Sequence, residues 1–259
     1  MTSKKTIIVT GGSGLLGSAL VPYLSKKGYY VIVIDKEDTN NSVEDEIEYL
    51  KFDLTDINQY DKLVEQVSQI TNNLYGLVNN AAYNPKIESQ DSFGDFESLS
   101  LPEWNKELEL NLSSPVFLVK AFLPIFNREN NDYCKIINVI STYGIVPPNQ
   151  NIYKALSSKN KIKILKPVAY PVTKAALLMF TKYLSTYPGC KGINVNGIAP
   201  GGIENNQDQV FINSYSENVP LGRMAQVEEM LETFGLLLSN KSNYIHGQVI
   251  AVDGGWTTW

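Results

Sequence analysis

The sequence has little of what many catalytic sites are built from. Its 259 residues contain one histidine, His246, and two distant cysteines, Cys134 and Cys190. These are too few soft ligands for an ordinary zinc site, and a Ser-His-Asp triad would have to use His246. We therefore expect no metal. Two lone cysteines also do not make the paired framework of a secreted domain, which favours a reduced, cytoplasmic compartment.

The chain also lacks a basic surplus and a long apolar run. Its formal charge is −5, and all but two of its 22 basic residues are lysine, which argues against nucleic-acid binding. The first apolar stretch, residues 6–10, is too brief for the core of a signal peptide, and no apolar run approaches the roughly 18 residues of a membrane span. We expect neither nucleic acid nor membrane as a partner.

What the sequence does contain is an alternation of short β-branched runs with longer helical patterns. This order predicts an α/β fold in one domain, residues 1–259, with a doubly wound parallel sheet of about seven strands flanked by helices. The expected strands are Thr6–Thr10, Tyr30–Asp35, Tyr49–Asp53, Leu74–Asn79, Lys135–Ser141, Ile193–Ala199 and Gln248–Asp253. The expected helices are Leu15–Lys27, Ile57–Ile70, Pro102–Phe126, Pro171–Tyr187 and Val227–Leu238.

A glycine-rich turn, Thr10-Gly-Gly-Ser-Gly-Leu-Leu-Gly17, follows the first strand and opens the first helix. Glycines at such a turn let the backbone approach a pyrophosphate and direct helix amides toward it. Asp35 ends the second strand, 18 residues after Gly17, where an acid accepts hydrogen bonds from ribose hydroxyls and repels a 2′-phosphate. The glycine turn and Asp35 together favour NAD as the cofactor, while the neighbouring Lys36 leaves NADP possible.

Further motifs follow in order along the chain: Asp53-Leu54, Asn79-Asn80-Ala81-Ala82, Asn111, Ser141, Tyr170-Pro-Val-Thr-Lys174, Asn196-Gly-Ile-Ala-Pro-Gly201, Pro220-Leu-Gly-Arg223 and Val252-Asp-Gly-Gly255. Together with the glycine turn they resemble those of the short-chain dehydrogenase/reductase family, a family of single-domain Rossmann-fold oxidoreductases. Three positions depart from the classical pattern. Ala82 replaces a glycine, Leu15 gives the turn the spacing of the extended subfamily of epimerases and dehydratases, and Asn205 replaces a common threonine.

The resemblance implies a set of residues that contact the cofactor. They are Gly11, Ser13, Gly14, Leu15, Leu16, Gly17, Asp35, Asp53, Leu54, Asn80, Ala81, Tyr170, Lys174, Pro200, Gly201 and Ile203. It also implies assembly as a homodimer or homotetramer through the helices that carry Asn111 and Tyr170. The aromatic ending, Trp256 and Trp259, is expected at such a subunit contact, and His246 is expected to be structural.

Tyr170 and Lys174 are four residues apart, which places phenol and ammonium on one helix face. A nearby cation favours phenolate, so we expect Lys174 to lower the pKa of Tyr170 and make it a general acid/base. In the mechanism that the resemblance implies, Tyr170 exchanges a proton with the substrate oxygen during hydride transfer, and Ser141 hydrogen-bonds that oxygen. Lys174 binds the nicotinamide ribose, and Asn111 holds a water in a proton relay.

Tyr153 is a rival for the catalytic tyrosine. It lies 12 residues after Ser141, close to the family's usual gap, whereas Tyr170 lies 29 after it. Tyr153 is followed four residues later by Ser157 instead of lysine, so nothing would lower its pKa. Tyr170 is therefore the preferred candidate.

The choice of Tyr170 implies an insertion at about residues 143–168, where the family places the wall of its substrate pocket. The insertion contains five lysines and no acid, a local charge of +5 in a chain of −5, which leaves −10 for the rest. It is either merely solvated or it attracts an anionic substrate. The lysines are Lys154, Lys159, Lys161, Lys163 and Lys166.

The sequence thus predicts an NAD(P)-dependent oxidoreductase that interconverts a secondary alcohol and a ketone. A sugar, sugar phosphate or nucleotide sugar is favoured as substrate, because the insertion and its surroundings resemble oxidoreductases of bacterial surface-glycan and flagellin-modification pathways. Three alternatives stay open: reduction of a 3-oxoacyl carrier protein, an epimerase or dehydratase with tightly bound NAD, and a non-catalytic cofactor-binding scaffold or regulator.

Overall fold

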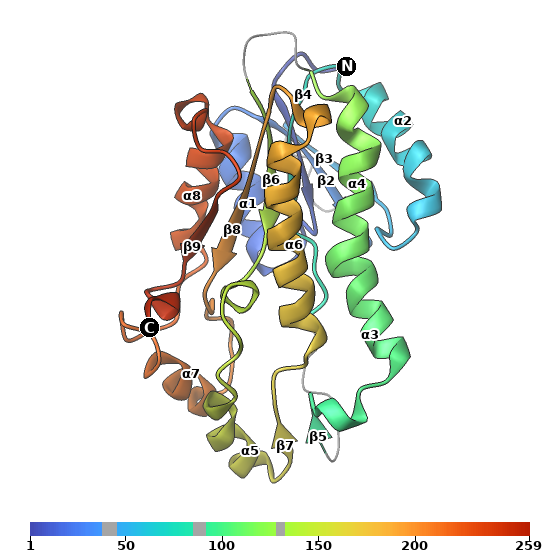
Figure 1. The fold of residues 1–259 in the computed structure, drawn as a ribbon. Helices are drawn as coiled ribbons and strands as arrows, with labels where there is room; N and C mark the ends of the chain where they lie inside the picture. The colour runs from blue at the N-terminus through green and yellow to red at the C-terminus, as the bar shows by residue number, and fades with distance from the viewer. Residues whose placement is uncertain (38–45, 85–91, 128–132) are drawn as a thin grey trace.

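The structure is a computed structural model, which describes residues 1–37, 46–84, 92–127 and 133–259 (Figure 1). Seven parallel strands form one sheet in the order β3-β2-β1-β4-β6-β8-β9. The strands are β1 (Thr6–Thr10), β2 (Tyr30–Asp35), β3 (Ile47–Lys51), β4 (Leu74–Asn79), β6 (Cys134–Val139), β8 (Ile193–Pro200) and β9 (Val249–Val252). The chain reverses direction across the sheet beside β1, which confirms the predicted doubly wound α/β fold.

Helices cover both faces of this sheet because its central strands are apolar on both sides. One core layer packs under α1 (Leu15–Lys26) and α8 (Glu228–Leu238), and it includes Leu20, Leu24 and Phe234. The opposite layer packs under α2 (Tyr60–Ile70), α4 (Ser114–Phe122) and α6 (Ala169–Thr186).

The long helix expected at residues 102–126 is divided into four parts, the last of which is a 3-10 turn, Leu123–Ile125. Helix α3 (Leu101–Leu108) starts at Ser100, whose hydroxyl accepts from the Glu103 amide while the Glu103 carboxylate accepts from the Ser100 amide. A π-helical turn, Glu109–Ser113, follows and leads into α4. This turn carries Asn111 and shifts the register of the helix at the candidate site.

Strand β3 lies two residues earlier than expected, at Ile47–Lys51. Ile47 is buried and pairs with Val31, whereas Asp53 forms a turn by accepting from the amide and hydroxyl of Thr55. The sequence also predicts a surface loop at the polar, acidic residues 39–48, and most of these lie outside the described residues. The predicted strand ended too late, at Asp53, because a short polar residue can favour a turn as readily as the end of a strand.

The insertion is folded, not an extended loop. It contains a 3-10 turn (Gln150–Tyr153), helix α5 (Lys154–Asn160) and strand β7 (Lys163–Ile164). Strand β7 pairs in parallel with β5 (Ser92–Phe93) to form a second, two-stranded sheet. Figure 1 shows this unit with α7 (Gln209–Ser216) below the carboxyl ends of the main strands.

One helical stretch among the described residues, Leu101–Ile125, has the length and apolar composition that would allow it to cross a membrane. The prediction that no run approaches this length is true only of uninterrupted apolar runs, because this stretch is interrupted by Glu107 and Asn111. Core helices meet the same criterion, so the finding alone assigns no membrane role.

Candidate active site

The glycine turn after β1 is shaped by close backbone contacts. A Cβ on Gly17 would lie 2.2 Å from the carbonyl oxygen of Gly11, and Gly11 itself has a positive φ of 65°. Gly14 caps α1 without a side-chain hydrogen bond, and no acid lies in the first turn of the helix. The N-terminal amides of α1 therefore remain directed at the turn, an arrangement that fits a pyrophosphate.

Asp35 lies beside this turn at the end of β2. Its Oδ2 accepts a hydrogen bond from the Ser13 amide at 3.0 Å, and its Oδ1 accepts from the Glu37 amide at 3.2 Å. The carboxylate is thus held at the edge of the glycine turn, where it fits the hydroxyls of an adenosine ribose. Ser13 is both a turn residue and the anchor of the acid.

Asn80 and Ala81 tie the ends of β1 and β4 together. The Thr10 hydroxyl accepts from both of their amides at 3.0 Å, and the Asn80 side-chain amide donates to the carbonyls of Thr10 and Gly11 at 2.9 Å. Leu54, in contrast, is 6% exposed and packs in the core layer under α2. Its side chain is mainly a core residue.

The remaining predicted cofactor residues follow β8. Gly201 lies against β9, and a Cβ there would be 2.8 Å from Cα of Asp253. Ile203 forms a bridge with Ala225. The Asn205 amide is used locally, since it donates to the side chain of Gln207. A pocket opens beside Gly201 and continues toward Arg223.

Asn111 is buried in the π-helical turn. Its Oδ1 accepts from the Tyr83 amide at 2.6 Å, and its Nδ2 donates to the Tyr83 carbonyl at 2.9 Å and to the Thr173 hydroxyl at 3.5 Å. The Asn111 side chain therefore joins the segment after β4 to α6. Its partner on α6, Thr173, is the residue before Lys174.

Ser141 and Tyr170 meet at the carboxyl end of β6. Ser141 lies two residues after the end of this strand, and a hydrogen bond between its side chain and Tyr170 acts to lower the pKa of the phenol. Burial nevertheless raises the pKa of Tyr170 overall, and the nearby Glu107 raises it further. The expected lowering by Lys174 is therefore not seen.

The reason lies in where the Lys174 ammonium points. It donates to the carbonyl of Val139 at 2.8 Å and lies 5.8 Å from the centre of the Tyr170 ring. Burial, aided by the charge of Lys166, lowers the pKa of Lys174 to about 7. A partly neutral ammonium at this distance stabilises a phenolate only weakly.

Tyr153 lies near Tyr170 but is surrounded by apolar and aromatic side chains. Its ring packs against Phe211 with the ring centres 5.5 Å apart, in an apolar cluster that also includes Tyr143 and Val146. Burial raises the pKa of Tyr153 to about 12. The structure thus places Tyr170, and not Tyr153, beside Ser141, Lys166 and Lys174.

This arrangement matches known proteins over the whole chain. The sequence model of the short chain dehydrogenase family matches residues 5–166. The chain belongs to this family. A second model, described as enoyl-(acyl carrier protein) reductase, matches residues 156–257. As a short-chain dehydrogenase/reductase, the protein is an NAD(P)-dependent oxidoreductase acting on CH–OH and C=O groups.

Individual relatives show the same extent of similarity. Post-translational flagellin modification protein A of Campylobacter coli is 26% identical over 265 residues, with 99% of each chain covered. A 3-oxoacyl-(acyl-carrier-protein) reductase of Chlamydia muridarum is 29% identical over 262 residues, with 97% of this chain and 96% of the relative covered. The crystal structure of a short chain dehydrogenase from Leptospira borgpetersenii with bound NAD+ has a TM-score of 0.85 at 30% identity, covering 98% of this chain and 93% of that one.

Two charged residues beside Tyr170 were missed as site residues by sequence reasoning. Lys166 was counted only as one of five loop lysines, yet its ammonium lies 3.8 Å from the centre of the Tyr170 ring and donates to Oδ1 of Asn84 at 2.6 Å. Glu107 is buried on α3, close enough to influence both Lys166 and Tyr170. Lys166 precedes Tyr170 by four positions, and Glu107 precedes Asn111 by four. This spacing was the only feature of the sequence that could have drawn attention to the two residues.

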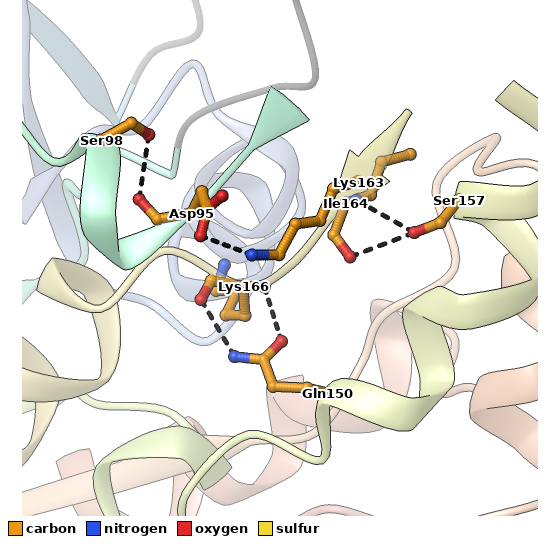
Figure 2. Close-up of polar contacts among 7 residues, drawn as sticks. All are labelled: Asp95, Ser98, Gln150, Ser157, Lys163, Ile164 and Lys166. Atoms are coloured by element: carbon orange, nitrogen blue, oxygen red, sulfur yellow. Dashed lines mark hydrogen bonds and ion pairs between the residues drawn. The ribbon is translucent and has the colours of Figure 1, made fainter. Parts of the chain in front are cut away.

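The other insertion lysines do not form a free basic patch. Lys163 donates to Oδ1 of Asp95 at 2.7 Å, and Lys159 forms an ion pair with Asp208 (Figure 2 shows the Lys163 contact). Lys154 and Lys161 are exposed. The sequence counted charges within the insertion alone, whereas the fold brings acids from two other segments against it.

Residues near the C-terminus have structural contacts. His246 bridges α6 and β8, because Nδ1 accepts from the Val195 amide and Nε2 lies 2.7 Å from the Ser185 carbonyl. Trp256 is 6% exposed and stacks on Tyr215 with the ring centres 4.5 Å apart, so most of its surface is buried within this chain. Trp259 is exposed.

Proposed function

We propose that Tyr170 is the general acid/base of a reaction that interconverts a secondary alcohol and a ketone. The observation that carries this proposal is the convergence of Tyr170, Ser141 and Lys174 at the carboxyl end of β6, beside the glycine turn. Open parallel sheets bind their ligands at this edge. NAD, or alternatively NADP, supplies and accepts the hydride when bound.

The chain's own residues would handle the proton. In reduction, Tyr170 donates its phenolic proton to the substrate oxygen, and in oxidation the phenolate removes the hydroxyl proton. Ser141 hydrogen-bonds the same oxygen. Lys174 holds the nicotinamide ribose and, with Asn111, supports proton exchange with solvent.

We assign cofactor binding to the residues around the glycine turn and the ends of β2, β4 and β8. The close contacts at Gly11 and Gly17 leave the turn without side chains, and the Asp35 carboxylate favours ribose hydroxyls over a 2′-phosphate. These features support NAD as the preferred cofactor.

As substrate we propose a sugar, sugar phosphate or nucleotide sugar in surface-glycan biosynthesis. The Lys166 ammonium lies over the Tyr170 ring and is hydrogen-bonded to Asn84, and such polar groups suit a hydroxylated substrate better than an acyl chain. The similarity to a flagellin modification protein supports the same choice. The second candidate is 3-oxoacyl-(acyl-carrier-protein) reduction, which the similarity to such a reductase favours.

We further propose a cytoplasmic homodimer or homotetramer. The exposed faces of α4 and α6 carry Phe117, Met179 and Tyr183, large apolar side chains that an assembly would cover.

A screen of nicotinamide fluorescence tests the function. Purified protein would be incubated with NADH or NADPH and panels of oxidised sugars, sugar phosphates, nucleotide sugars and 3-oxoacyl thioesters. We expect NADH to be consumed with a carbohydrate ketone. Consumption with acyl thioesters alone would select the second candidate, and conversion of a nucleotide sugar with no net change in cofactor absorbance would indicate an epimerase or dehydratase.

A further inference from the structure

The insertion holds one of its lysines at the candidate site. The amide of Lys166 donates to Oε1 of Gln150 at 2.8 Å, and Nε2 of Gln150 donates to the Lys166 carbonyl at 3.2 Å (Figure 2). One side chain thus makes two hydrogen bonds to the same stretch of backbone, four residues before Tyr170. The backbone from which the Lys166 side chain extends is therefore fixed by the folded insertion.

The Lys166 ammonium joins Tyr170 to the segment after β4. It lies 3.8 Å from the centre of the Tyr170 ring and donates to Oδ1 of Asn84 at 2.6 Å. An ammonium has three donors, and the contact with Asn84 uses one of them. Within the part of the chain that the structure describes, this ammonium forms no ion pair. The half-buried Lys166 therefore keeps both a charge and donors for a ligand.

The other four insertion lysines are placed differently. Two of them are paired with acids from other segments, and the remaining two are exposed. Among the described residues, Lys166 is the only insertion lysine whose ammonium lies over the Tyr170 ring. The positive charge of the insertion thus reaches the candidate site through Lys166.

A second ammonium, that of Lys174, lies 5.8 Å from the centre of the same ring. Burial lowers the pKa of Lys174, and the charge of Lys166 lowers it further, so the two cations repel each other. An anion bound beside Lys166 would lessen this repulsion. Because Lys174 is assigned to the cofactor ribose, Lys166 is the cation that remains for the substrate.

Glu107 is the acid whose charge acts on Lys166. It is buried on α3, and no ion pair joins it to Lys166 in the described structure. Burial raises the pKa of Glu107 to about 7, although the charge of Lys166 acts to lower it. Near pH 7 about half of these carboxyls are therefore protonated, which weakens their repulsion of an anion. Lys166, whose pKa burial lowers to about 8, keeps most of its charge at that pH.

We propose that the Lys166 ammonium binds an anionic group of the substrate, a carboxylate or a phosphate carried close to the carbon that is oxidised or reduced. The anion would accept from the donors that the contact with Asn84 leaves open. The inference rests on the proposed function, and it narrows the substrate class to a sugar acid or a sugar phosphate. It makes Lys166 a specificity-determining residue supplied by the insertion.

Calorimetric titration of the full chain, saturated with NADH, tests the proposal without turnover. Gluconate and glucose 6-phosphate are the carboxylate and phosphate probes, and glucose is the neutral one. Bound NADH keeps the probes away from the site of the cofactor's own phosphates. Lys166→Met should weaken the Kd of at least one anionic probe about tenfold or more, because a hydrogen bond to a charged group is lost. Lys166→Arg should keep the wild-type Kd within about threefold. Lys154→Met, which removes an exposed charge from the same insertion, should leave the Kd unchanged.

The proposal is overturned if Lys166→Met binds the anionic probes as tightly as Lys154→Met does. If Lys166→Met does not fold, the wild type still decides, because anionic probes that bind no more tightly than glucose contradict the account. Binding of gluconate alone would support a sugar acid, and binding of glucose 6-phosphate alone a sugar phosphate. Failure of the proposed function would appear separately, as full turnover by Tyr170→Phe.

Discussion

The glycine turn at residues 10–17 and the insertion at residues 143–168 lie on two sides of the same candidate site but are held in different ways. The turn depends on missing side chains, since a single Cβ on Gly17 would overlap the backbone of Gly11. The insertion depends on side chains that are present. Gln150 clamps the backbone of Lys166, and Ser157 does the same for Ile164 (Figure 2).

This difference teaches how each region can change. A steric requirement is absolute, so the turn tolerates few substitutions. Individual hydrogen bonds contribute only about 0.5–1.5 kcal/mol each, so the insertion can lose one and remain folded. We therefore expect cofactor binding to fail abruptly with single changes, and the environment of Tyr170 to change gradually.

The largest effect is expected from Gly17→Ala. The added methyl group would lie 2.2 Å from the Gly11 carbonyl oxygen, so the turn must move. We expect a loss of about 3 kcal/mol in the free energy of unfolding and at least a roughly tenfold weaker Kd for NADH. Gly14→Ala is the matched control, because its methyl group would meet nothing closer than 3.4 Å. Equal NADH titrations for the two variants would contradict the steric account.

Glu107→Gln should stabilise the protein at alkaline pH. The folded-state pKa of Glu107, about 7, lies above its ordinary value of 4.5, so ionising the carboxyl destabilises the fold as pH rises from 4.5 through 7. Glutamine has no such titration, and its advantage should reach on the order of 2 kcal/mol above pH 8.

Urea unfolding at pH 5 and pH 8.5 measures this difference. Glu103→Gln is a control on the same helix with the opposite expectation, since hydrogen bonds from Ser100 lower the pKa of Glu103. That stabilisation is present above its ordinary pKa and lost in acid. A Glu107→Gln advantage that does not grow with pH would show that the carboxyl is not destabilised by burial.

Gln150→Leu should loosen the insertion without unfolding the main sheet. It removes two hydrogen bonds to the backbone of Lys166 and should lower the free energy of unfolding by about 1–2 kcal/mol. Hydrogen exchange should speed up at the Lys166 amide while the amides of β1 stay protected. Asn151→Leu, an exposed neighbour, serves as the control. If hydrogen exchange speeds up equally across the main sheet, the insertion and the sheet open together and the account is contradicted.

The smallest effect is expected from Lys163→Met. Its ion pair with Asp95 joins β7 to the turn after β5, but the lysine side chain is about half exposed. Exposed pairs contribute little because solvent and salt screen them, so the shift in a urea midpoint should be barely measurable in 150 mM salt. A midpoint shift as large as that of Gln150→Leu would place the ion pair among the main supports of the insertion.

The comparison also explains what sequence reasoning could reach. The parallel sheet, the glycine turn and the spacing of Tyr170 and Lys174 follow from local patterns, such as apolar runs and fixed spacings, whereas Asn111 and Ser141 were chosen by resemblance to the family. The insertion's structure could not be predicted, because β7 has only two residues and its partner β5 lies about 70 residues away in the chain. The pairing of Lys159 and Lys163 with Asp208 and Asp95 is equally non-local.

The environment of Tyr170 was misjudged for a related reason. Spacing places Lys174 on the same helix face, but it cannot show that the ammonium is drawn to the Val139 carbonyl. Nor can it show that burial dominates the pKa of a phenol. Glu107 comes near Tyr170 only when α3 packs against α6, so its effect on the pKa of the phenol appears only in the folded chain.

The central claim is that Tyr170 transfers the proton, and one pair of variants tests it. With a substrate identified by the fluorescence screen, Tyr170→Phe and Tyr153→Phe would be compared in kcat and in NADH affinity. We expect Tyr170→Phe to bind NADH as the wild type does and to lose about 10²–10⁴-fold in kcat, while Tyr153→Phe keeps most of its activity. Full turnover by Tyr170→Phe, or a loss confined to Tyr153→Phe, would contradict the account.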